Sequence, residues 1–137
     1  MLTEEERNAV EAAARNGETG FALELMRALS RSGRIEELPQ LVAVFADSVE
    51  TNRVPVRNYL AQRVPAILVN HYFPAVLALH QPTDSTYQDF VQYTLDHQGW
   101  EEPIVHAVLE GDASKLTAAV RQLLDQVAQH AGVHASR

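Results

Sequence analysis

"VEAAARNGETGFALELMRAL", Val10 to Leu29, is the stretch that decides the fold of this chain. Alanines and aliphatic residues recur at helical spacing on both sides of Asn16-Gly17, a pair that is typical of the end of a helix. The stretch therefore predicts two helices joined by a short turn. Thr3 and Glu6 upstream form a capping box, so we expect the first helix to begin there and to end at Arg15.

A second stretch with the same pattern lies near the other end of the chain. "VHAVLEGDASKLTAAVRQLL", Val105 to Leu124, aligns with the first stretch without a gap and places Gly111-Asp112 in the turn. The shared residues are alanines, aliphatics and turn formers, which any two helical hairpins have in common. The pattern is compatible with a true repeat, but it favours two unrelated hairpins.

The residues between these stretches carry further helical patterns. One helix is expected from about residue 36 to residue 50, with Pro39 in its first turn, where proline is tolerated. Its apolar stripe is Leu38, Leu41, Val42, Phe45 and Val49. Further helices are expected from Pro55, around Tyr87–Leu95, over 103–110, and from a cap at Asp112 or Ser114 to Gly132.

No segment alternates in the way of a β-strand between hairpin signals. We therefore predict an all-α fold: a single compact domain over residues 1–131, followed by a frayed tail at 132–137. About seven or eight short helices would be arranged as helical hairpins, in a bundle or an irregular repeat-like array.

The stretch "RVPAILVNHYFPAVLALHQP", Arg63 to Pro82, is different because no charged side chain follows Arg63 until Asp84. It is too short and too interrupted by polar residues and prolines for a membrane span, which needs about 20 apolar residues. We expect instead a fully buried central helix around which the others pack. Pro65 and Pro74 must break it into short helices or kink it into one bent rod.

Composition limits the kind of protein. The 137 residues contain no cysteine, which excludes disulfides and thiolate metal sites, and the formal net charge is −7. Such a charge argues against nucleic acid as the partner, because phosphate binding depends on clustered Lys and Arg. The first ten residues lack the basic and apolar regions of a secretory signal, so we expect a cytoplasmic protein.

Charge is also segregated along the chain. Residues 64–114 contain no Lys or Arg and seven acids: Asp84, Asp89, Asp96, Glu101, Glu102, Glu110 and Asp112. If these acids share a surface, they would favour a basic protein partner, with Trp100 as an anchor. The simpler interpretation is a solvated acidic surface and a tryptophan packed over a helix end.

Two other sets of residues could form sites. Asn70, His71, Tyr72 and His80 could line a small-ligand pocket, although His71 and His80 fall on opposite faces of a continuous helix. Glu102, His106 and Glu110 follow one another at one-turn intervals, a weak candidate for metal binding that a solvated face explains as well. No phosphate loop or nucleophile motif is present, and no cofactor is expected.

The sequence thus favours a non-catalytic, acidic, helical protein-binding module, such as an adaptor, chaperone or inhibitor of a more basic protein. A small-ligand sensor or enzyme built around Asn70 and His71 is the alternative. A self-associating subunit, with a homodimer as its simplest form, is the third hypothesis.

Overall fold

The structure, a computed structural model, describes residues 1–74 and 99–135, with side chains up to residue 126. Within these ranges all regular elements are helices and none is a strand, as the all-α prediction requires. The elements are α1 (Glu4–Arg15), α2 (Thr19–Arg31), the 3-10 turn η1 (Ile35–Glu37), α3 (Leu38–Ser48), α4 (Arg53–Ile67), the π-helical turn η2 (Leu68–Tyr72), α7 (Glu102–Leu109) and α8 (Ala113–Ala135). The helix predicted at 87–95 lies outside the described residues.

The predicted capping box starts α1. The backbone N–H of Glu6 donates to Oγ1 of Thr3 over 3.1 Å, and the N–H of Thr3 donates to Oε1 of Glu6 over 2.9 Å. Two backbone donors that the helix leaves unpaired are satisfied in this way.

Three helices end in the same turn, at Gly17, Gly33 and Gly111. Each glycine has φ between 69° and 80°, a conformation that glycine adopts without the steric cost of a Cβ. After α1, the N–H of Glu18 reaches back to the carbonyl of Ala13 over 2.8 Å, and α2 and α7 end with equivalent bonds. The two aligned stretches therefore share a turn, but α2 shares it too, so the turn is no sign of a repeat.

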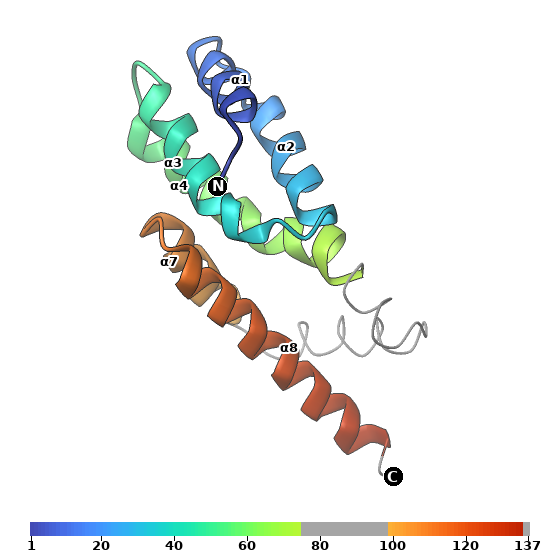
Figure 1. The fold of residues 1–137 in the computed structure, drawn as a ribbon. Helices are drawn as coiled ribbons and strands as arrows, with labels where there is room; N and C mark the ends of the chain where they lie inside the picture. Colours follow the sequence, from blue (N-terminus) through green and yellow to red (C-terminus); the bar gives the residue numbers. More distant parts are fainter. Residues whose placement is uncertain (75–98, 136–137) are drawn as a thin grey trace.

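Helix α3 is the centre of the described structure (Figure 1). It lies between α1 on one side and α7 and α8 on the other, and it also contacts α2 and α4. Leu38, Leu41, Val42 and Phe45 of the predicted stripe are buried. Burial of these apolar side chains against several helices at once supplies the main stabilising free energy.

The chain continues as one helical segment through Pro65. Because proline has no N–H, the carbonyl of Ala61 receives no backbone bond from position 65. Three residues later the helix widens into the π turn η2, which the N–H of Phe73 closes by donating to the carbonyl of Leu68. Of the two alternatives for this region, the structure shows the single rod as far as Tyr72.

The prediction that this region is buried all round is wrong for residues 63–74. Val64 and Leu68 are fully buried, whereas Arg63, Ala66 and Asn70 are exposed. One side of the rod packs on the other helices and the opposite side faces solvent, because its charged, small and polar residues tolerate exposure. In the part of the chain that the structure describes, no helix is long and apolar enough to cross a membrane.

Helix α8 continues past Gly132 to Ala135, so the prediction that Gly132 ends it is also wrong. A glycine inside a helix costs only about 1 kcal/mol relative to alanine, and helical residues on both sides can outweigh that cost.

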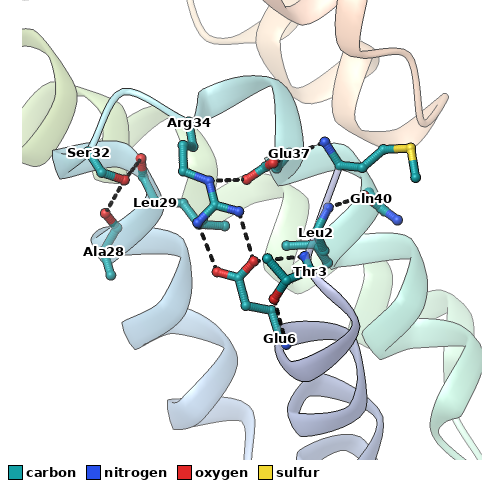
Figure 2. Close-up of polar contacts among 10 residues, drawn as sticks. Leu2, Thr3, Glu6, Ala28, Leu29, Ser32, Arg34, Glu37 and Gln40 are labelled. Atoms are coloured by element: carbon teal, nitrogen blue, oxygen red, sulfur yellow. Dashed lines mark hydrogen bonds and ion pairs between the residues drawn. The ribbon is translucent and has the colours of Figure 1, made fainter.

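A polar cluster joins the start of α1 to the segment before α3 (Figure 2). Arg34 donates from Nη2 and Nη1 to the two carboxylate oxygens of Glu6, over 2.7 and 2.9 Å. Its Nε lies 2.6 Å from Oε2 of Glu37, a close ion pair without hydrogen-bond alignment. Glu37 is only 5% exposed, and its other oxygen lies 3.0 Å from the α-amino group of Met1.

This cluster lowers the pKa of Glu6 to about 2. The hydrogen bond from Arg34 is the largest cause, followed by the backbone bond at Thr3. Both contacts stabilise the ionised carboxylate.

Candidate functional site

A groove of about 290 Å³ lies between α2 and the α4–η2 rod. It is open on one side. The residues that line it are Leu23 and Arg27 from α2, Tyr59, Arg63, Ala66 and Ile67 from α4, and Asn70 and His71 from η2.

Arginines give the groove its charge. The guanidinium of Arg63 stacks over the ring of Tyr59, 4.7 Å from the ring centre, which orders an exposed charged side chain. Arg27 is ion-paired to Glu24 one turn earlier on α2, so part of its charge is neutralised. Arg63 has no acidic partner among the described residues, so it can offer its N–H groups to a ligand.

His71 connects the groove to a third arginine. Its Nδ1 lies 3.2 Å from Nη1 of Arg31, on the last turn of α2. The pKa of His71 is lowered, first by burial and then by the positive charges of Arg31 and Arg27, while Glu24 acts in the opposite direction. The local electrostatic field at this end of the groove is therefore positive, and the imidazole is neutral at pH 7.

The structure brings together two of the four residues predicted for a ligand pocket. Asn70 and His71 line the groove. Tyr72 is absent from it and packs edge-on against Phe73, with ring centres 5.6 Å apart; burial and then Glu36 raise the pKa of its hydroxyl. His80 lies outside the described residues.

Sequence reasoning missed the arginines and Tyr59. A signal was present, since Tyr59, Arg63, Ala66, Ile67 and Asn70 follow the i, i+4, i+7, i+8, i+11 spacing of one helix face. This spacing was not used, because Pro65 indicated that the helix face is interrupted. On α2, Arg27 and Arg31 are one turn apart in the same way.

The predicted acidic surface is described only in part. Glu110 accepts a hydrogen bond from Nζ of Lys115 over 2.7 Å, which raises the pKa of that lysine. Asp112 caps α8 by accepting from the N–H of Lys115 over 3.0 Å, and Trp100 packs partly buried against the core. Glu101 is half-buried and Glu102 exposed, at the start of α7. Asp84, Asp89 and Asp96 lie outside the described residues.

Glu102, His106 and Glu110 are all exposed on α7 and its end. Glu110 is engaged with Lys115. No group of three or more His, Cys, Asp or Glu side chains suited to a metal ion occurs where the structure describes the chain.

A second groove of about 320 Å³ lies between η1 and α8. Its residues are Glu36, Ala113, Ser114, Thr117, Ala118 and Arg121. It is shallower and is lined mostly by small side chains, with one charge of each sign, so it offers a ligand little to recognise.

Comparison with known proteins gives no match, either to a family model, to a curated protein or to a solved structure. The function has to be inferred from the chemistry of the chain's own residues.

Proposed function

We propose that this protein is a binding module that holds an anionic group in the groove between α2 and the α4–η2 rod. The observation that carries the proposal is Arg63, which is ordered over Tyr59 at the groove without an acidic partner in the described residues. Arginine is a donor that keeps its charge at any physiological pH, so its natural ligand is a carboxylate or a phosphate.

The neighbouring groups favour the same ligand. Arg27 adds a second guanidinium, and the Asn70 side chain adds an amide. Because Arg31 occupies Nδ1 of His71, the neutral imidazole offers Nε2–H, which is a donor. Most of the polar groups lining the groove therefore donate hydrogen bonds.

Thermal unfolding with a panel of anions tests the proposal. Inorganic phosphate, citrate and an acidic peptide are compared with chloride at equal ionic strength, since a ligand at 100 times its Kd stabilises by about 2.7 kcal/mol. We expect at least one anion to raise Tm in the native protein and not in Arg63→Gln. Arg15→Gln, with the same charge change at the exposed end of α1, should behave like the native protein. No response to any anion, or equal responses in all three proteins, would contradict the proposal.

The acidic protein-binding surface is the second candidate. Trp100, Glu101 and Glu102 are consecutive, and Glu102 is exposed. A basic protein partner would dock on these residues. The double variant Glu101→Gln, Glu102→Gln should no longer bind that partner, and it should still bind phosphate at the groove.

We also propose a helix count, a cellular location and an oligomeric state for this protein. We expect seven or eight short helices in a hairpin arrangement within one domain, a cytoplasmic location, and a homodimer as the form that self-association would take. Sedimentation over a range of concentrations tests the last of these.

A further inference from the structure

The shape of the groove limits what it can hold. Along the rod it extends from Tyr59 to His71, which is roughly 18 Å at about 1.5 Å per residue. Its volume of about 290 Å³ is spread over this length and is open on one side. Pockets that enclose small molecules start at about 300 Å³ and bury most of the ligand surface. A long, open groove suits an extended or helical chain segment better.

The lining combines charge with apolar surface. Arg27 and Arg63 provide donors, and the partly buried Leu23 and the exposed Ala66 provide apolar contacts. Tyr59 is 41% exposed and is the one groove residue among the exposed large hydrophobic side chains that the structure describes. A phosphate ion or a citrate would satisfy the arginines and leave these apolar groups uncovered.

We infer that the occupant of this groove is an acidic, amphipathic segment of a protein partner, lying along α2 and the α4–η2 rod. The inference rests on the proposed function and adds the class of ligand. Acidic side chains of the segment meet Arg27 and Arg63, and its apolar side chains cover Leu23, Tyr59 and Ala66. A nucleic acid fits less well, because its phosphate backbone would meet the arginines and leave the apolar residues uncovered.

The test is a selection from a random displayed peptide library on the whole protein, followed by fluorescence anisotropy of labelled winners. We expect winners rich in Asp and Glu with Leu, Ile or Phe at intervals of three to four residues. Replacing their apolar residues with Ser, or their acids with Lys, should weaken binding at least ten-fold. Rising salt should weaken it as well.

Variants of the protein locate the site. Arg63→Gln and Arg27→Gln should each weaken binding by about ten-fold. Ala66→Glu should abolish it, because Ala66 is exposed and the new carboxylate repels the acidic segment. Gln122→Glu, at an exposed position on α8 outside the groove, carries the same charge change and should leave binding intact. Circular dichroism of each variant checks that it is folded.

Four outcomes would overturn the inference. If phosphate binds at the groove and selected peptides do not, the anion-binding function stands and the peptide class is wrong. The peptide class is also wrong if peptides bind equally well after their apolar residues are replaced by Ser. It is wrong as well if a single-stranded oligonucleotide or a second copy of the chain occupies the groove instead. If neither anions nor peptides respond to Arg63→Gln, the proposed function and the inference both fail.

Discussion

Nη1 of Arg31 lies 3.2 Å from Nδ1 of His71, 40 positions further along the chain. Because an arginine only donates, Nδ1 must accept, and the proton of the neutral imidazole is on Nε2. This contact links the last turn of α2 to the π turn η2 and sets the protonation state of one end of the groove.

The titration of His71 tests this contact. We expect its pKa to lie below 6.5 in the native protein and to rise in Arg31→Gln, which removes one of the positive charges. The rise should stop short of the ordinary value, because burial is the larger cause and remains. NMR of the imidazole nitrogens measures both the pKa and the tautomer. Arg121→Gln should leave the titration unchanged, and a native tautomer with the proton on Nδ1 would contradict the assignment.

Arg34 should matter more for stability than other surface arginines. In Arg34→Gln, Glu6 loses two hydrogen bonds and the buried carboxylate of Glu37 loses a cation, which should lower the free energy of unfolding by more than the loss of an exposed ion pair does. Arg7→Gln breaks only the exposed pair with Glu11 and should cost under about 1 kcal/mol. Urea unfolding distinguishes them, and equal losses would show that the cluster has no special role.

Glu6 gives the stability a definite pH dependence. Its pKa is about 2 in the folded chain and has the ordinary value of 4.5 without these contacts, so the unfolded state binds more protons between these values. The stabilisation is therefore complete above about pH 4.5 and is lost as the pH falls through about 2. We expect Glu6→Gln to remove this part of the pH dependence of the free energy of unfolding. Glu5→Gln, at an exposed position in the same turn, should retain it.

Phe45 tests the central position of α3. Its side chain is 1% exposed, and Phe45→Ala should cost about 3 to 5 kcal/mol because a cavity is left in the core. Phe21 is 39% exposed on α2, so Phe21→Ala should cost far less. Thermal unfolding of the two variants makes the comparison, and similar Tm values would be incompatible with α3 as the centre.

Local signals in the sequence predicted most helix starts and ends. Thr3 and Glu6, and the glycines at 17, 33 and 111, act through bonds within a few residues, so their effect is visible without a tertiary structure. The helix end expected at Gly132 was wrong. A glycine inside a helix has a local cost that helix continuation on both sides can outweigh.

The candidate site was predicted only in part. Asn70 and His71 stood out as polar residues in an uncharged stretch, and they do line the groove. Arg27 and Arg31 looked like ordinary surface residues of a different helix, and no local pattern says that α2 lies beside η2.

The sequence by itself determined that the described chain is helical and where most of its turns fall, because capping, glycine conformation and apolar spacing are short-range effects. Only the tertiary structure decided that α3 is central and that Arg31 meets His71. It also placed Arg27, Arg63 and Tyr59 around one groove. These relationships depend on how the helices pack, and packing is set by the fit of all their faces together and not by any one stretch of the chain.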